Sequence, residues 1–312
     1  MTTGFVSFRH PARGVETGWL QNGNIYVWPE LSEGILGLIQ SRRINDGSFI
    51  NELDLRARRE RPEFSFADLA AAAPGSSEAH IVLPFSPPEV WGAGVTYRKA
   101  ADLHEEDIRA EGGTPGLYTY VFSSERPEIF FKAMGRHCVG YKEPFVIRGD
   151  SCGTMIEAEL ACIYDAGGKI VGYTIANDVT AWDIEKESPL FLSYAKTFMG
   201  CCALGPVVVP ASLVENPSAL PVECSIVRNG QAIYSGGGNT SFMKRTLLEL
   251  SNYLCYCKEI PAGTVLCTGT AVGIPNDLAI EAGDRVTIEI ASLGTLTNNA
   301  RRWPALADRR FA

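Results

Sequence analysis

Long apolar runs and long unbroken runs of positive charge are both missing from this chain of 312 residues. No segment approaches the roughly twenty apolar residues that a membrane-spanning helix requires. No run of Lys and Arg occurs, and 36 acidic residues outnumber 28 basic ones, giving a net charge of −8. This charge argues against nucleic acid or an anionic membrane as a partner. The N-terminal segment 1–10 lacks the apolar core of a secretory signal, so we expect a cytoplasmic protein.

Histidine is also scarce, with four residues against nine cysteines. The histidines do not cluster with the cysteines, and neither Cys201-Cys202 nor Cys255-x-Cys257 has the two-residue spacer of a zinc knuckle. Most cysteines lie in apolar segments, as reduced core thiols of a cytosolic protein do. The pattern therefore favours structural thiols over a zinc site, and no nearby histidine supports a cysteine nucleophile.

The remaining composition, 46% hydrophobic and 21% charged, is that of an ordinary globular chain. Residues 73–79 are rich in Ala, Pro, Gly and Ser and form the best linker candidate. We therefore place a small N-terminal α/β domain at 1–79 and a larger domain at 80–312. Many short strands with few helices predict a β-rich α+β fold for the larger part.

A few helices are expected from local patterns. The N-terminal part contains two helical segments, 31–42 and 65–73, and a polar helical segment at 98–111 follows an apolar strand. That polar segment is either a lid over a site or a plain surface helix. The clearest helical periodicity spans 242–258, with Thr240 or Ser241 as its cap.

Three carboxylates interrupt an otherwise apolar pair of predicted strands. Glu157 and Glu159 are two residues apart, so their side chains point to one face of the strand, about 7 Å apart along the backbone. The turn sequence 165–168 predicts a hairpin to a second strand that ends at Asp178. With the loop centred between residues 166 and 167, Glu157 faces Ala176. Asp178 then falls on the face of both glutamates, one diagonal step beyond Glu157.

Three hard oxygen ligands on one face suit Mg²⁺, with Mn²⁺ and Ca²⁺ as alternatives, and leave coordination positions for water and substrate. The alternative interpretation is a solvated strand face that carries ordinary acids. The apolar flanks and the dipeptide Asn177-Asp178 favour the metal interpretation, with Glu157, Glu159 and Asp178 as ligands.

A series of motifs from Trp91 to the C-terminus resembles the fumarylacetoacetate hydrolase superfamily. Their order and spacing make the resemblance specific. The motifs are Gly92-Ala93-Gly94-Val95-Thr96-Tyr97, Arg126-Pro127-Glu128-Ile129-Phe130-Phe131-Lys132, Glu157-x-Glu159, Val171 to Asp178, Lys196, Ala203-Leu204-Gly205-Pro206, Gly238-Asn239-Thr240-Ser241 and Thr268-Gly269-Thr270.

The resemblance implies a mixed β-sandwich roll, commonly a homodimer, with Mg²⁺ at the three acids. It also implies a 2-oxo acid substrate that chelates the ion through its keto and carboxylate oxygens, so that the ion stabilises the enolate formed at C3. Lys196 is similar to the active-site lysine of the family and would add positive charge near that enolate, or act as a base.

The same resemblance assigns substrate contacts. Thr240 would meet the distal end of the substrate, and Thr270 would hold its carboxylate. Tyr97 belongs to the first motif and would also contact substrate. Lys132 is expected either at the margin of the site or in a pair with an acid.

One position departs from the family pattern. Hydrolases of carbon–carbon bonds in this family carry a histidine three residues after the tyrosine of the first motif, paired with a glutamate, whereas this chain has Ala100 there. Alanine cannot accept a proton. The sequence is therefore more similar to the branch that dehydrates 2-keto-3-deoxy sugar acids, which also carries the tripeptide Asp183-Ile184-Glu185.

Dehydration needs removal of a C3 proton and loss of the C4 hydroxyl. Glu128, or an acid of the polar segment (Glu105 or Glu106), would assist the leaving hydroxyl, and Lys196 would be the base. The alternative is a hydrolase of a 2,4-diketo acid in which His104 or a nearby acid replaces the missing pair. A third hypothesis is a non-catalytic relative, and the cost of keeping buried, unpaired carboxylates argues against it.

Overall fold

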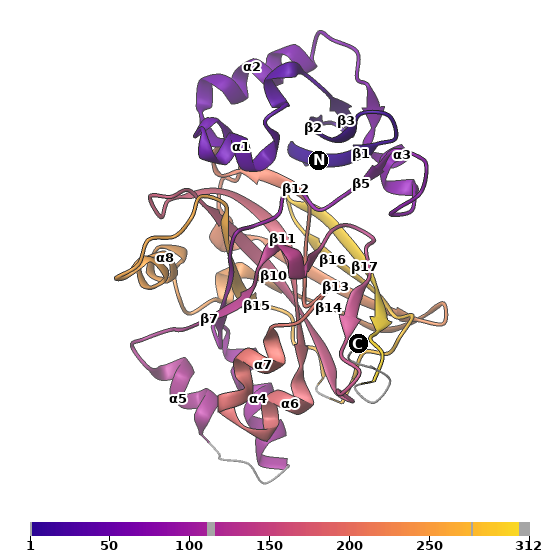
Figure 1. Cartoon of the computed structure of the whole chain (residues 1–312). Coiled ribbons are helices and arrows are strands. Elements are labelled where there is room, and N and C mark those ends of the chain that lie inside the picture. Colours follow the sequence, from indigo (N-terminus) through magenta and orange to yellow (C-terminus); the bar gives the residue numbers. More distant parts are fainter. Residues whose placement is uncertain (1, 111–115, 276, 306–312) are drawn as a thin grey trace, which may run out of the picture.

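A large mixed sheet forms the centre of the molecule, as a computed structural model describes it for residues 2–110, 116–275 and 277–305 (Figure 1). Ten of its strands follow one another in space. Their order is β4 (Phe64–Ser65), β3 (Asn24–Tyr26), β2 (Gly14–Gln21), β1 (Gly4–His10), β12 (Cys202–Pro210), β11 (Ile170–Ala181), β10 (Thr154–Tyr164), β15 (Thr264–Thr270), β6 (Val90–Gly94) and β7 (Glu128–Ala133). Two short strands join it at the side, β5 (His80–Ile81) on β1 and β8 (Cys138–Val139) on β12.

A second sheet of five strands packs against the first. Its order is β14 (Gln231–Asn239), β13 (Pro221–Arg228), β16 (Arg285–Ile290), β17 (Gly294–Arg302) and β9 (Phe145–Ile147). Most neighbours are antiparallel, whereas the pairs β15–β6, β12–β8 and β17–β9 are parallel. The expected mixed, β-rich sandwich roll is confirmed.

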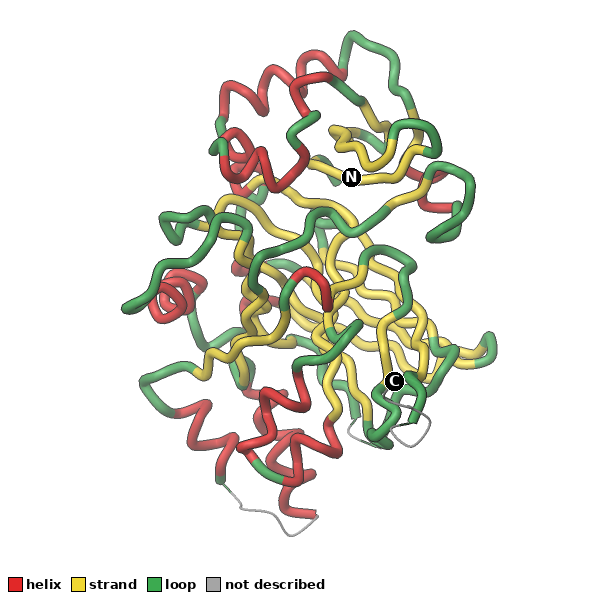
Figure 2. Tube along the Cα trace, in the orientation of Figure 1, coloured by secondary structure: helices red, strands yellow, loops and turns green. Residues whose placement is uncertain are grey.

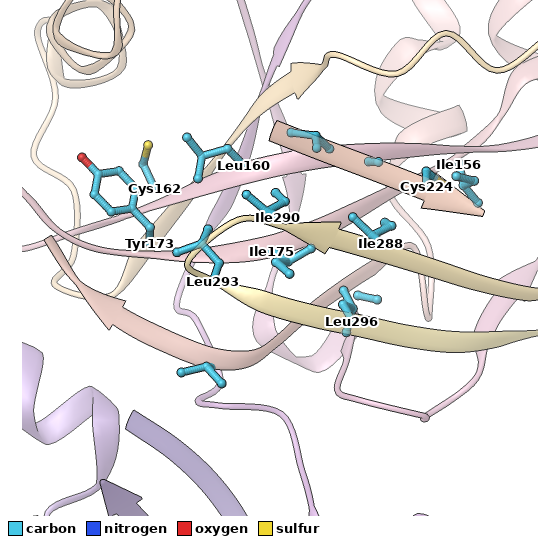
Figure 3. Close-up of a cluster of buried hydrophobic side chains, with 14 of the residues drawn as sticks. Ile156, Leu160, Cys162, Tyr173, Ile175, Cys224, Ile288, Ile290, Leu293 and Leu296 are labelled. Carbon is cyan, nitrogen blue, oxygen red and sulfur yellow. The ribbon is translucent and has the colours of Figure 1, made fainter. Parts of the chain in front are cut away.

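The main core lies between the two sheets (Figure 3). Leu160, Cys162 and Ile175 of the β10–β11 hairpin belong to one apolar cluster with Ile288 and Leu296 of the second sheet. Because side chains alternate along a strand, the intervening residues of β10 point to the opposite face. On that face Ala161 and Ile163 belong to a different cluster, which the N-terminal part covers.

The N-terminal part joins the large sheet through β1, where Phe5 faces Val208 and Val6 faces Val207 of β12. Its buried aromatic residues, including Phe5 and Trp19, pack on the sheet face that carries Val208. The division into domains at 79/80 stays a prediction, because a shared sheet is compatible with one domain or two.

The N-terminal helices differ from the expected ones in their limits. The segment 31–42 is shorter in the structure, because Gly34 and Arg42 adopt left-handed backbone angles and leave only α1 (Gly34–Gln40) helical. The second predicted helix is present as α3 (Phe66–Ala71), capped by Ser65. The sequence analysis missed α2 (Gly47–Ala57), although Asp46 caps it by accepting from the N–H groups of Ser48 and Phe49.

The predicted helix at 242–258 is wrong in its beginning and its cap. Residues Thr240–Phe242 form a 3₁₀ turn, and the helix is α8 (Leu247–Cys255). Its cap is Thr246, whose side chain accepts from the Glu249 N–H at 3.0 Å. The apolar periodicity correctly indicated a helix in this segment. Thr240 does not cap this helix, because its hydroxyl is hydrogen-bonded to Pro217 and Leu220.

Four helices gather at one end of the large sheet, at the bottom of Figure 1, and Figure 2 shows them grouped in red. They are α4 (Arg98–Ala110), α5 (Leu117–Ser123), α6 (Trp182–Glu187) and α7 (Leu192–Lys196). We call this group the helical cover. The polar helix expected at 98–111 is present as α4, and residue 111 itself lies outside the described residues.

The other 3₁₀ turns are short connections, at Pro29–Leu31, Arg43–Asn45, Gly135–His137, Pro189–Phe191, Ala211–Leu213 and Pro217–Ala219. Within the described ranges, none of the helices combines the length and the apolar character needed to traverse a bilayer.

Candidate active site

The β10–β11 hairpin brings the three predicted carboxylates together, in a register that differs from the expected one. Glu157 lies opposite Asp178, and Glu159 lies opposite Ala176. The predicted pairing of Glu157 with Ala176 is therefore wrong by two residues. The turn closes between Asp165 and Lys169, and an irregularity beside Tyr164 shifts the pairing once more. A shift of two residues keeps every side chain on its predicted face.

The carboxylates form a compact cluster in which Glu157 is half-buried and the other two are buried. Glu157, Glu159 and Asp178 offer oxygens that all lie within 4.8 Å of one another. Glu159 is 3% exposed and Asp178 1% exposed. Glu159 Oε2 accepts a hydrogen bond from the Gly269 N–H at 2.6 Å. Gly269 has a φ of +90°, which glycine adopts at little cost, so the backbone of β15 can turn its N–H toward the acid.

Two buried lysines balance part of this negative charge. Lys196 Nζ lies 2.7 Å from Glu157 Oε2 and 3.6 Å from Asp178 Oδ1. Lys132, which is fully buried, lies 2.6 Å from Asp178 Oδ1 and donates to the carbonyl oxygens of Val179 and Lys196. Burial by itself would lower the pKa of each ammonium, but the neighbouring carboxylates outweigh it and raise the pKa of both lysines. Both are therefore cationic.

The electrostatics of the cluster favour a further cation. Burial, together with the charge of Asp178, raises the pKa of Glu157 and of Glu159, the latter to well above its usual range. A divalent cation between the three oxygens would relieve this repulsion and restore the ionised form. Three carboxylates without sulfur or imidazole are the donor set that hard ions such as Mg²⁺ prefer. The residues present fit a magnesium site.

A small cavity of about 40 Å³ adjoins the acids, which is room for roughly one water molecule or ion. Glu128 and Lys196 line it, together with Thr270. Glu128 pairs with Gly94 across β6 and β7, and a Cβ on Gly94 would come within 2.2 Å of Glu128 Oε2. The absence of a side chain at Gly94 therefore makes room for this carboxyl group. Burial raises the pKa of Glu128.

The other predicted site residues lie around this cavity at different depths. Lys132 lies behind Asp178, away from the cavity lining, in the pair with an acid that was one of its two expected positions. Tyr97 and Glu106 line a neighbouring cavity instead. The Thr240 hydroxyl donates to the Pro217 carbonyl (2.9 Å) and accepts from the Leu220 N–H (2.8 Å). Their assignments as catalytic or substrate-binding residues stay predictions, as do those of Lys196, Glu128 and Thr270.

Two of the expected lid residues can be placed in part. Glu105 is buried and accepts from the N–H groups of Gly116 and Thr119, so it holds the beginning of α5. Glu106 is exposed. The side chain of His104, named above as a substitute for the missing histidine, lies outside what the structure describes.

Sequence reasoning gave no role to two residues that line the cavity, Glu185 on α6 and Tyr118 on α5. The tripeptide Asp183-Ile184-Glu185 was the available signal. Asp183 anchors α6 by accepting from Ser151 Oγ (2.6 Å) and from the Cys152 N–H (2.7 Å). Glu185, two residues later, can then reach the cavity, whereas nothing in the sequence pattern indicated Tyr118.

Comparison with known proteins finds one matching family model and similar enzymes. The family model for the C-terminal part of fumarylacetoacetate (FAA) hydrolase matches residues 90–301. The 2-dehydro-3-deoxy-D-arabinonate dehydratase of Saccharolobus solfataricus is 41% identical over 226 residues, which are 72% of this chain and 76% of that protein. A probable 2-keto-3-deoxyxylonate dehydratase of Haloferax volcanii is 38% identical over 222 residues, 71% of this chain and 75% of that protein.

A solved structure extends the likeness to nearly the whole chain. It is that of 2-keto-3-deoxy-D-arabinonate dehydratase complexed with magnesium and 2,5-dioxopentanoate. The TM-score is 0.79 at 32% identity, and the match covers 96% of this chain and 99% of that one.

Proposed function

Because the chain belongs to the fumarylacetoacetate hydrolase family, as the match over residues 90–301 shows, we propose that it is a Mg²⁺-dependent hydro-lyase acting on a 2-keto-3-deoxy sugar acid. The observation that carries the proposal is the buried cluster of Glu157, Glu159 and Asp178 beside the cationic Lys196. The similarity to two sugar acid dehydratases supports the substrate class, a small 2-oxo acid.

The three acids would hold Mg²⁺, which supplies Lewis acidity toward a bound 2-oxo acid. Lys196 is cationic and contacts two of these acids, so it would stabilise negative charge that develops on the substrate. For the same reason it is poorly suited to accept a proton in this state. Glu128, which lines the same cavity, is the better candidate for the C3 proton, and Thr270 at the cavity wall would orient the substrate.

The size of the cavity bears on how substrate enters. The cavity beside the acids is narrow, with a volume of about 40 Å³. Tyr118, Glu185, Leu192 and Lys196 supply part of its wall from the helical cover. We therefore expect these side chains to move outward when substrate binds.

The decisive experiment is incubation of the pure protein with Mg²⁺ and a 2-keto-3-deoxypentonate, followed by NMR of the products. We expect 2,5-dioxopentanoate. Pyruvate or another short keto acid would instead support the hydrolysis of a carbon–carbon bond. Turnover that survives dialysis against EDTA unchanged would contradict both metal-dependent reactions.

We also propose a cytoplasmic location and assembly as a homodimer or a higher homo-oligomer. All nine cysteines are free thiols, which is usual in a reducing compartment. Leu190, Phe191, Tyr194 and Met199, on and beside α7, are exposed large apolar side chains that a second subunit could cover. Light scattering of the protein eluted by size exclusion tests the assembly, and a monomer at micromolar concentration would contradict it.

A further inference from the structure

Glu185 is a carboxyl group of the cavity whose two oxygens have different surroundings. Oε1 accepts a hydrogen bond from the Tyr118 hydroxyl at 3.4 Å. Oε2 is buried and has no hydrogen-bond partner among the described residues. A buried polar atom without a partner is unfavourable, so it is seldom kept without a ligand or a reaction that uses it. Oε2 is therefore available for a group that enters the cavity.

The surroundings of Glu185 keep it protonated to an unusually high pH. Burial raises its pKa to about 7, although the charge of Lys196 on α7 opposes the effect. The carboxylates of Glu157, Glu128 and Asp178, on β10, β7 and β11, act in the same direction as burial. A carboxyl group in this state can donate a proton near neutral pH, as a general acid must.

The position of Glu185 separates it from the acids that would hold the keto acid end of the substrate. Those acids lie on the strands β10 and β11, whereas Glu185 and Tyr118 belong to the helical cover. C4 of the substrate is two bonds from the keto carbon. A group on another wall of the same cavity is therefore well placed to serve the C4 hydroxyl, and Glu185 lines that cavity from α6.

We infer that Glu185 is a further catalytic residue, which protonates the departing C4 hydroxyl, and that Tyr118 is the positioning residue that orients it. The inference rests on the dehydration proposed above.

The step balances without a co-reactant. The C3–H bond breaks and its proton passes to Glu128. The electron pair left at C3 forms the C3–C4 double bond as the C4–O bond breaks. The departing oxygen keeps the electron pair of the C4–O bond, takes the proton of Glu185 and leaves as water. Glu128 is then protonated and Glu185 ionised, and proton transfer through solvent restores both. The immediate product, 5-hydroxy-2-oxopent-3-enoate, becomes its isomer 2,5-dioxopentanoate when one proton moves from C5 to C3 and another from the C5 hydroxyl to C4.

Two reactions of the Mg²⁺-loaded protein distinguish the role of Glu185 as the acid from that of Glu128 as the base. The first is dehydration of 2-keto-3-deoxypentonate. The second is exchange of the C3 protons of 2-oxobutanoate with D₂O, followed by NMR, which needs no leaving hydroxyl. We expect Glu185→Gln to lower the rate of dehydration roughly 10²- to 10⁴-fold and the rate of exchange less than about 10-fold. Glu128→Gln should lower both rates to a similar degree.

The control is Glu187→Gln, which changes an exposed carboxyl of the same helix and should leave both rates unchanged. An equal loss of dehydration and exchange in Glu185→Gln would overturn the inference. If Glu185→Gln dehydrates as fast as the wild type, only the role of Glu185 fails. If the wild type exchanges C3 protons but releases no water, the proposed function fails, and the role of Glu185 fails with it.

Tyr118→Phe tests the positioning role and does not depend on the folding of the first variant. Removing the hydroxyl should lower dehydration by about 10-fold and shift the alkaline limb of its pH profile, with exchange little affected. Tyr120→Phe alters a residue of the same helix that is 71% exposed and serves as its control. An unmoved pH profile in Tyr118→Phe would contradict the positioning role.

Discussion

The two faces of the β10–β11 hairpin use the same strands for opposite purposes. One face carries Leu160, Cys162 and Ile175, which pack against the second sheet (Figure 3). The other face carries Glu157, Glu159 and Asp178, which two buried lysines balance only in part. The apolar face stabilises the fold through burial. The acidic face carries an unfavourable electrostatic arrangement that a bound cation would relieve. Beside the acids, stability and function are thus separated by the alternation of side chains, whereas farther along the second face Ala161 and Ile163 pack under the N-terminal part.

The largest effect is expected from a substitution on the acidic face, at Glu159. Glu159→Gln should weaken Mg²⁺ binding more than about 100-fold. Loss of a residue that only orients a metal ligand already lowers affinity about 10- to 100-fold, and Glu159 would bind the ion directly. The metal-free variant should be at least as stable as the wild type, since a buried charge with a raised pKa is removed. Titration calorimetry and urea unfolding measure the two effects, with exposed Glu223→Gln as control. Unfolding of the variant would mean that the acid is structural.

The pair of Lys132 with Asp178 should be the most sensitive point for stability on the acidic face. Lys132→Met leaves Asp178 without this cation in a buried position, which should destabilise the metal-free protein by about 3–5 kcal/mol. Saturating Mg²⁺ should recover part of this loss. Urea unfolding in EDTA and in Mg²⁺ gives both numbers, and the exposed Lys169→Met is the matched control. A stability equal to that of the wild type in EDTA would show that the pair contributes nothing.

The apolar face should respond in stability alone. Leu160→Ala removes a side chain that is 1% exposed between the sheets and should cost about 2–5 kcal/mol. Because Leu160 points away from the acids, Mg²⁺ affinity of the folded variant should not change. Leu248→Ala, at a position 70% exposed, should stay within about 0.5 kcal/mol of the wild type. A large change in Mg²⁺ affinity would show that the two faces are not independent.

The smallest expected effect is on the pH dependence of stability. The pKa of Glu185 is about 7 in the folded protein against a usual 4.5, so the folded state binds more protons between these values. The free energy of unfolding of the metal-free protein should therefore fall as the pH rises from about 4.5 to 7. In Glu185→Gln this decline should be smaller by about 1–3 kcal/mol over that window. Urea titrations at four pH values in EDTA test it, and an identical slope in both proteins would contradict the expectation.

Local patterns predicted much of the sheet and its acidic face. The period of two along β10 and the turn signal after Tyr164 were enough to place Glu157, Glu159 and Asp178 together. The register itself was missed, because the turn and the irregularity beside Tyr164 depend on contacts that a strand pattern does not contain. The beginning of α8 was missed for a related reason, since the hydroxyl of Thr240 is engaged by Pro217 and Leu220, about twenty residues earlier in the chain.

The sequence alone therefore determined which side chains share a strand face, because alternation follows from the geometry of each residue. Only the tertiary structure decided that Lys132 pairs with Asp178, and that Tyr118 from one helix and Glu185 from another meet at the same cavity. Lys132 and Asp178 are 46 positions apart in the sequence, and Tyr118 and Glu185 are 67 positions apart. Such contacts depend on how whole elements pack, and no short-range pattern records that packing.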